Sequence, residues 1–425
     1  MIEGSNNLLL LTPEFVLAGL ALLVFTADLI IPEGKKEWVG RIAVVGLIGL
    51  LFVTASTVMG INQPVYNNFL LVDHYSFVFK MIFITVGIIT ILMSEEFVKT
   101  NLTSQGEYYG LVLLAILGMN ILVQSQEFLT AYISLELLSF CLYVLVGYSK
   151  FNPKSNEAAI KYIIFGTFSS AILLYGLSMV YSVVGSTLYS DIAQVLSTSG
   201  FMDPVAMLGI TFIMIGIAFK LGIVPFHSWI PDVYEGAPTP ITMFLSVASK
   251  SAGLAILLRI LLSIFDVKDV SSDTWNNTLN WPDIGMSLAI MSVFTMFIGN
   301  ILAIRQTSIK RMLGYSSIAQ AGYLLIGIVS IISSKTVSDA TYVSSVLVAY
   351  VLGYMFTNIS AFYSIISMQQ NRDTYNFNDF SGYGRIQIVN SLVLSTAMLS
   401  LIGIPPTIGF ITKLFLFSSG ISAGY

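Results

Sequence analysis

The sequence predicts an all-α protein that crosses a membrane many times. Of its 425 residues, 56% are hydrophobic and only 10% are charged, whereas soluble domains carry about 25% charged residues. Apolar runs of the ~20 residues that a helical span needs recur from end to end. These runs are continuous and do not alternate with polar residues, which excludes a transmembrane β-barrel.

Twelve candidate spans follow one another along the chain. The fourth and fifth are separated only by a tight turn at Ser125-Gln126. The first run contains Glu14 and lacks a basic flank, so it is interpreted as a retained helix and not as a signal peptide. The spans lie near residues 8–31, 39–60, 75–97, 108–125, 127–149, 157–184, 204–226, 240–265, 284–304, 314–333, 340–368 and 389–418.

The distribution of basic residues predicts the orientation of the chain. With the N-terminus outside, the outside loops carry only Lys268 and Lys335, and the inside loops carry eleven basic residues. Such a bias predicts the N-terminus outside, because inside loops carry the excess of lysine and arginine. The eleven are Lys35, Lys36, Arg41, Lys99, Lys150, Lys154, Arg305, Lys310, Arg311, Arg372 and Arg385.

Two of the spans are interrupted by proline, the seventh at Pro225 and the twelfth at Pro405-Pro406, about 180 residues later. Paired interrupted helices, five spans apart, indicate two repeats of opposite topology with an ion site at the breaks. The predicted division is a three-helix segment at 1–103, a first five-helix repeat at 104–265 and a second, inverted repeat at 284–425. The second repeat is one span short, so the sequence is expected to be partial.

Several ionisable side chains lie within the predicted spans, where a central charge costs about 2.5–3.5 kcal/mol on insertion scales. They are expected to face protein or water, and Lys220, Lys250, Lys413 and Glu136 are the strongest candidates for moving protons. A lysine whose proton affinity depends on a nearby carboxylate can be loaded and discharged by moving charge. Arginine, effectively always protonated, could not serve.

Other ionisable residues allow two interpretations. Lys161 follows Glu157 by four residues on one helical face, which suits either a proton path or an interfacial ion pair. His227, just past the first break, could shuttle protons or cap a helix end. Lys80 and Arg259 lie near span ends, where snorkelling towards the interface is expected. Glu14 and Asp28 are expected to be interfacial.

The chain lacks the patterns of the common redox, metal and nucleotide sites. Its one cysteine, Cys141, rules out an internal disulfide, a Cys-rich zinc site and an iron–sulfur cluster. The two histidines form no metal-ligand pattern. The sequence contains neither a Gly-rich dinucleotide fingerprint after a strand nor a phosphate-binding GKS/T. We therefore expect no cofactor or metal in this chain.

Four segments resemble subunit N of the proton-pumping NADH–quinone oxidoreductases (respiratory complex I), which corresponds to subunit 2 of mitochondria and chloroplasts. They are AFKLGIVPFHSWIPDVYEGAPTPITMFLSVASK, SNEAAIKYIIFGTFSSAILLYG, AIRQTSIKRMLGYSSIAQAGY and GIPPTIGFITKLFLF. The resemblance covers most of the chain from about residue 108 onward. The third segment is also shared with sister antiporter-like subunits and cation/proton antiporters.

This resemblance implies an antiporter-like fold of fourteen helices with two inverted repeats and broken seventh and twelfth helices. It also implies a proton path through Glu136, Lys161, Lys220, His227, Lys250 and Lys413. Glu136 would modulate Lys220, Lys250 would lead to the second half-channel, and Lys413 would be the exit lysine. Quinone reduction, FMN and iron–sulfur clusters would belong to partner subunits.

The resemblance further implies partners and a location. The partners would be other membrane subunits, the lipid bilayer and protons, without nucleic acid. The chain would be a multi-pass protein of a bacterial inner membrane. Three alternatives stay open: a subunit of an ion-gradient-driven cation/proton antiporter, a subunit of a ferredoxin- or hydrogenase-linked complex, and a structural spacer between pumping neighbours.

Overall fold

The computed structural model describes residues 7–102, 105–199, 203–264, 266–268, 275–277, 282–334, 337–368 and 375–424. Within these residues, eleven helices are long and apolar enough to cross a membrane. The twelfth predicted span is divided into two shorter apolar helices, at Ile388–Ile402 and Ile408–Ser422. The predicted all-α architecture with about twelve spans is therefore confirmed, with two short hairpins added to it.

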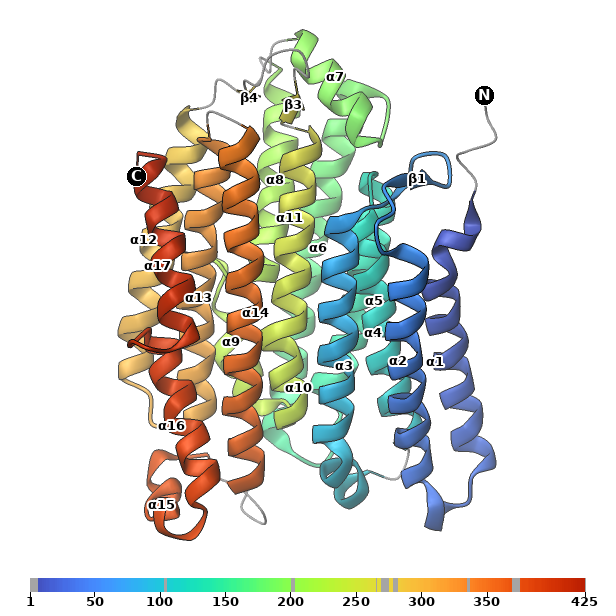
Figure 1. The fold of residues 1–425 in the computed structure, drawn as a ribbon, viewed down its shortest axis with the longest axis vertical. Helices are drawn as coiled ribbons and strands as arrows, with labels where there is room; N and C mark the ends of the chain where they lie inside the picture. Colours follow the sequence, from blue (N-terminus) through green and yellow to red (C-terminus); the bar gives the residue numbers. More distant parts are fainter. Residues whose placement is uncertain are drawn as a thin grey trace. The chain divides into compact units, whose positions relative to one another are not determined.

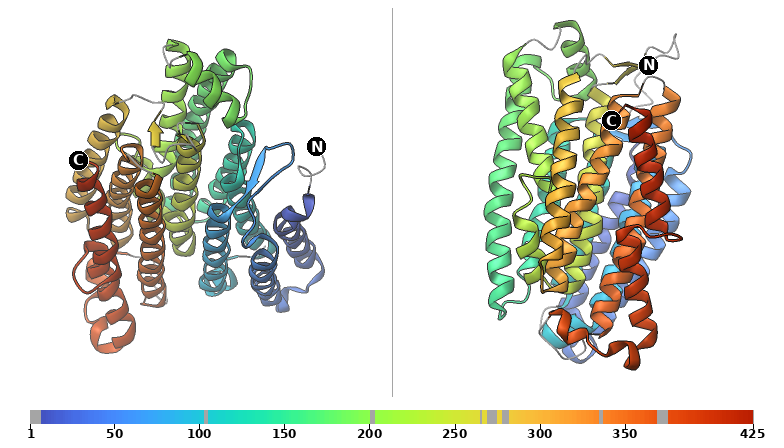
Figure 2. Two further views of the ribbon diagram at one scale, coloured as in Figure 1. Left: turned by 45° about the horizontal axis from the view of Figure 1, so that its top comes forward. Right: turned by 90° about the vertical axis from the view of Figure 1, so that its left-hand side faces the viewer.

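The chain forms two compact units. The first contains residues 1–217 and 236–264, and the second contains residues 218–235 and 265–425. The chain therefore passes from the first unit to the second within the seventh span and returns to the first unit just before the eighth. Figures 1 and 2 show the long helices of each unit running alongside one another.

The first unit begins with a 3-10 turn and two helices, and two short strands then lead to the longer helices. Helix α1 packs against α2 and α4, and α4 packs against α3 and α5. The elements are η1 (Leu8–Leu11), α1 (Thr12–Ile30), η2 (Glu33–Lys35), α2 (Glu37–Val58), β1 (Gln63–Val65), β2 (Leu70–Val72), α3 (His74–Asn101), α4 (Gln105–Gln124), α5 (Phe128–Val146), α6 (Pro153–Val184), α7 (Tyr189–Ser199), α10 (Thr239–Phe244), η3 (Leu245–Ser249) and α11 (Lys250–Ile264).

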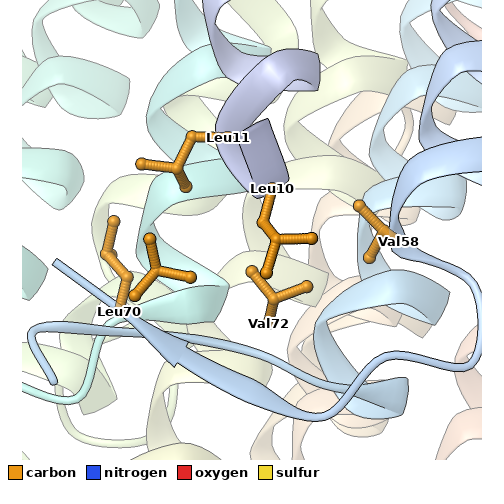
Figure 3. Packing of buried hydrophobic residues seen from close by; sticks show 6 residues of the cluster. Leu10, Leu11, Val58, Leu70 and Val72 are labelled. Atoms are coloured by element: carbon orange, nitrogen blue, oxygen red, sulfur yellow. The ribbon is translucent and has the colours of Figure 1, made fainter. Parts of the chain in front are cut away.

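Strands β1 and β2 form an antiparallel hairpin that covers one end of the first unit. Its turn places Tyr66, Asn67 and Asn68 in the left-handed region, which asparagine tolerates better than most residues. The hairpin side chains join a buried apolar cluster, shown in Figure 3, that seals the ends of α1 and α2. Its members are Leu10, Leu11, Val58, Val65, Leu70 and Val72.

The second unit is built from the last residues of α8 (Pro204–Leu221), the short helix α9 (Trp229–Gly236) and the C-terminal helices. Helix α12 packs against α13, and α14 packs against α13, α16 and α17. The remaining elements are β3 (Asp266–Lys268), β4 (Trp275–Asn277), α12 (Pro282–Ile304), α13 (Ile309–Ile332), α14 (Val337–Met368), η4 (Phe377–Phe380), α15 (Tyr383–Ile386), α16 (Ile388–Ile402) and α17 (Ile408–Ser422).

Candidate functional site

The six residues of the predicted proton path divide equally between the two units. Glu136, Lys161 and Lys250 belong to the first unit, and Lys220, His227 and Lys413 belong to the second. Lys220, Lys250 and Lys413 are buried, with exposed fractions of 5%, 4% and 9%. These three lysines therefore do not face lipid, as the cost of placing a charge in a membrane span predicts.

Glu136 and Lys161 lie on the neighbouring helices α5 and α6 of the first unit. Glu136 is half-buried, and its Oε1 is buried without a hydrogen-bond partner among the residues that the structure describes. Lys161 forms an ion pair with Glu157 at 2.7 Å, and both side chains are partly exposed. The four-residue spacing thus produces the ion pair that the sequence allowed.

Lys250 follows an irregular stretch of the eighth span. The five residues Leu245–Ser249 form a turn of π-helix, η3, and Lys250 begins the α-helix that continues from it. Such π turns inside α-helices are rare and occur frequently at functional sites. Every residue from Thr239 to Leu261 is buried. Its sequence, with serine on both sides of the lysine, did not reveal the π turn.

Lys220 lies one residue before the end of α8, at the first helix break. The helix ends four residues earlier than Pro225, because Gly222 adopts a left-handed φ of 73°. Its N–H donates to the Phe219 carbonyl at 3.0 Å, and the Ile223 N–H donates to the Ala218 carbonyl at 3.0 Å. This pair of bonds is the Schellman arrangement that closes helix C-termini at glycine. His227 lies beyond the break, half-buried.

The second break also follows a left-handed glycine. Helix α16 ends at Ile402 and is followed by Gly403, which has a φ of 94°. The Gly403 and Ile404 N–H groups both donate to the Leu399 carbonyl. The sequence Gly-Ile-x-Pro occurs at both breaks, starting at Gly222 and Gly403, and the x–Pro peptide is cis in both. Figure 2 shows the chain leaving the helical path between α16 and α17.

Lys413, on α17, occupies the second break. Its Nζ donates to the carbonyl oxygens of Leu401 at 2.5 Å and Ile402 at 3.3 Å, which are freed because α16 stops there. The same ammonium lies 4.5 Å from the centre of the Tyr323 ring. The lysine therefore satisfies the carbonyl end of a half-helix and holds a positive charge at the break.

Replacing Lys413 by methionine is expected to destabilise the chain by about 1–3 kcal/mol, the cost of leaving a buried carbonyl without its donor. Glutamine at this position, which can still donate, is expected to recover part of that loss. The measurement is the SDS concentration that unfolds the purified chain in mixed micelles. Equal midpoints for wild type and Lys413→Met would contradict this role.

The structure corrects the expectation that Arg259 snorkels. Its side chain is only 6% exposed and forms a two-bond ion pair with Asp73 at 2.6 and 3.0 Å. The guanidinium also donates to the Val123 carbonyl at 2.8 and 3.0 Å and lies 4.8 Å from the centre of the Tyr75 ring. Asp73 caps α3 through Ser76. The sequence analysis missed Asp73, although a D-x-x-S pattern just before an apolar run is a signal for a helix N-terminus.

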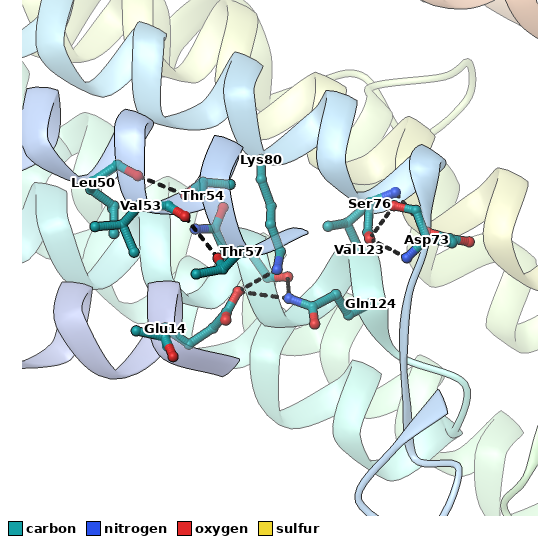
Figure 4. A network of polar contacts seen from close by, with 12 residues as sticks. Glu14, Leu50, Val53, Thr54, Thr57, Asp73, Ser76, Lys80, Val123 and Gln124 are labelled. Atoms are coloured by element: carbon teal, nitrogen blue, oxygen red, sulfur yellow. Dashed lines mark hydrogen bonds and ion pairs between the residues drawn. The ribbon is translucent and has the colours of Figure 1, made fainter. Parts of the chain in front are cut away.

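Lys80 and Glu14 are also buried rather than interfacial, with exposed fractions of 0% and 6%. Lys80 Nζ lies 2.8 Å from Glu14 Oε1, and Gln124 Nε2 donates to the same oxygen at 2.7 Å. Figure 4 shows the three side chains pointing towards one another from α3, α1 and α4. The sequence of one span cannot predict such a pair, because the partner residue lies on another helix.

A third set of charges holds the segment after the first break. Arg311, on α13, donates to Asp232 at 2.7 Å and to Glu235 at 2.9 Å, both on α9. The Tyr234 hydroxyl lies 3.0 Å from the Ser317 hydroxyl on the same pair of helices. These contacts explain why charged residues follow the break in the segment WIPDVYEG: they fix α9 within the second unit.

The comparisons with known proteins identify the family. Residues 125–425 match the family model described as "NADH:quinone oxidoreductase/Mrp antiporter, TM". NADH-quinone oxidoreductase subunit N of Moorella thermoacetica is 40% identical over 99% of this chain and 83% of its own length. The chain belongs to the NADH-quinone oxidoreductase subunit N family. The subunit N of Trichlorobacter lovleyi is 36% identical over 99% of this chain and 82% of its own length.

Solved structures agree with this assignment. A chain of respiratory complex I from Thermus thermophilus is 27% identical and superposes with a TM-score of 0.78, covering 97% of this chain and 84% of that one. A chain of the Mrp complex from Dietzia has a TM-score of 0.80 at 18% identity, covering 98% of this chain and 75% of that one. The Mrp similarity shows the shared antiporter-like fold alone.

Proposed function

We propose that this chain is the proton-translocating membrane subunit of an NADH-quinone oxidoreductase. One observation carries the proposal: in a chain of this family, ionisable side chains are buried inside membrane spans where the backbone is irregular. Lys220 and Lys413 lie at the two helix breaks, and Lys250 follows the π turn. Buried intramembrane charges are rare and mark ion pathways.

In the proposed mechanism, protons move through Glu136, Lys161, Lys220, His227, Lys250 and Lys413. Each lysine takes up a proton when a carboxylate is near and releases it when the carboxylate moves away. One elementary charge that crosses 100 mV takes up about 2.3 kcal/mol, which an ion pair formed and broken in a protein interior can supply. Glu136 is the carboxylate that modulates Lys220, Lys250 passes the proton on, and Lys413 is the exit.

The energy comes from electron transfer to quinone in partner subunits, which hold the FMN and iron–sulfur clusters and bind NADH and quinone. This chain contributes the membrane path and contacts other membrane subunits and lipid. We place it in a bacterial inner membrane with its N-terminus outside. The two helix breaks support a membrane path in this chain, because freed backbone groups at membrane depth are tolerated where they line a hydrated cavity.

The test is proton pumping by the assembled complex in vesicles, measured together with quinone-reductase activity. Lys220→Ala is expected to reduce both activities severalfold while the complex still assembles. Lys150→Ala, which changes an exposed lysine in the loop after α5, is the control and is expected to leave both unchanged. Unchanged pumping in Lys220→Ala would place this lysine off the proton path and favour a structural spacer.

A further inference from the structure

A second group of buried polar residues lies outside the proposed proton path. Glu14, Lys80, Asn120 and Gln124, which we call the α1–α3–α4 polar cluster, come from three helices of the first unit. Their exposed fractions are 6%, 0%, 0% and 0%. Neither the breaks nor the lysines of the path explain why four polar side chains are buried here.

The polar contacts within this cluster are concentrated on one atom. Glu14 Oε1 forms an ion pair with the Lys80 ammonium at 2.8 Å and accepts a hydrogen bond from the Gln124 side-chain N–H at 2.7 Å. The Gln124 N–H₂ group also donates to the Asn120 carbonyl at 3.1 Å. Glu14 Oε2, Gln124 Oε1, Lys80 Nζ and both polar atoms of the Asn120 side chain are buried and have no hydrogen-bond partner among the residues that the structure describes.

Native proteins leave few buried polar atoms without a partner, and ordered water supplies the missing bonds where protein does not. The atoms without a hydrogen-bond partner are three acceptors and two donor groups, the Asn120 N–H₂ group and the Lys80 ammonium. A metal cation would meet the Lys80 ammonium and the Asn120 N–H₂ group, and an anion would meet the Glu14 carboxylate. Water, which both donates and accepts, matches all of them.

We propose that Glu14, Lys80, Asn120 and Gln124 line a buried water-binding site, in which bound water joins Glu14 Oε2 to the two amide side chains. Polar groups connect this site to the end of the unit. Lys80 lies one helical turn beyond Ser76, which bonds Asp73, and Gln124 follows Val123, whose carbonyl holds Arg259. The Asp73 side chain at that end is 16% exposed.

The first arm of the test is a density map of the assembled complex at a resolution that shows water. We expect density within hydrogen-bond distance, about 2.7–3.2 Å, of both Glu14 Oε2 and the Asn120 side chain. No density at this position would overturn the proposal. Density that appears only when sodium or potassium salt is added would assign the site to a cation and would also overturn it.

The second arm is Asn120→Leu, a replacement of similar size that removes two polar atoms without a protein partner. In a dry cluster this change would stabilise the chain, because it removes an unsatisfied group. In a hydrated cluster it removes the water bridge and leaves Glu14 Oε2 and Gln124 Oε1 without a hydrogen-bond donor. The melting midpoint of the complex is then expected to fall. A raised midpoint would overturn the proposal. If the variant does not assemble, the wild-type map decides alone.

Discussion

Replacing Arg259 by leucine is expected to destabilise the first unit by about 3–5 kcal/mol. The change leaves the Asp73 carboxylate buried without its partner, and removing one member of a buried ion pair costs this much. The Val123 carbonyl loses its donor as well. Cys141 is buried at 3% exposure on α5 of the same unit. Its reaction with a thiol reagent on heating the assembled complex therefore reports the unfolding of this unit.

The matched control is Arg41→Leu. Arg41 pairs with Glu37 at 3.6 Å with exposed fractions of 54% and 36%, and exposed pairs contribute only about 0–1 kcal/mol. The double change Asp73→Leu/Arg259→Leu is expected to recover part of the loss, because no charge is then left buried alone. Equal labelling midpoints for Arg41→Leu and Arg259→Leu would show that the pair contributes no stability.

The same pair predicts a pH dependence. Burial raises the pKa of the Asp73 carboxyl, but the hydrogen bonds and the charge of Arg259 outweigh burial and hold that pKa below its usual value. A carboxyl with a depressed folded pKa contributes stability that is present above its unfolded pKa, about 3.9, and is lost as pH falls through the folded pKa. Wild type is therefore expected to lose this contribution on acidification, and Asp73→Leu/Arg259→Leu is not.

Replacing Gly409 by alanine is expected to destabilise the second unit by about 2–4 kcal/mol. Gly409, on α17, lies so close to α16 that an added Cβ would overlap the backbone oxygen of Ser400. Backbone cannot move aside as a side chain can, so the two half-helices would have to separate, at an overpacking cost of about 1–3 kcal/mol. Separation would also lengthen the 3.1 Å bond from the Gly409 N–H to the Ser400 hydroxyl, which is worth about 1 kcal/mol.

Gly19→Ala is the control for this change. A Cβ at Gly19, in the middle of α1, would meet no atom within 4 Å, so alanine there is expected to be neutral or to stabilise by about 0.5–1 kcal/mol. Unfolding of the purified variants by SDS in mixed micelles measures both. If Gly409→Ala unfolds at the same SDS concentration as Gly19→Ala, the close packing of α16 on α17 does not contribute to stability.

The sequence by itself was sufficient to predict the spans, the two breaks and the family. Apolar runs long enough to cross a bilayer leave no soluble alternative, and glycine and proline interrupt a helix through their own backbone geometry. Both signals are local, so they need no knowledge of neighbouring helices. The Gly-Ile-x-Pro sequences at Gly222 and Gly403 are an example: each helix ends at the residue before the glycine.

The tertiary structure alone decided which polar residues near the span ends are buried. In the sequence, Lys80 and Arg259 resemble basic residues that extend to the membrane interface. In the structure they pair inside the first unit with Glu14 and Asp73, which come from distant parts of the chain. Lipid tails are as apolar as a protein core, so the sequence of a span does not distinguish the face that meets lipid from the face that meets protein. Only the packing of α1, α3, α4 and α11 makes that distinction here.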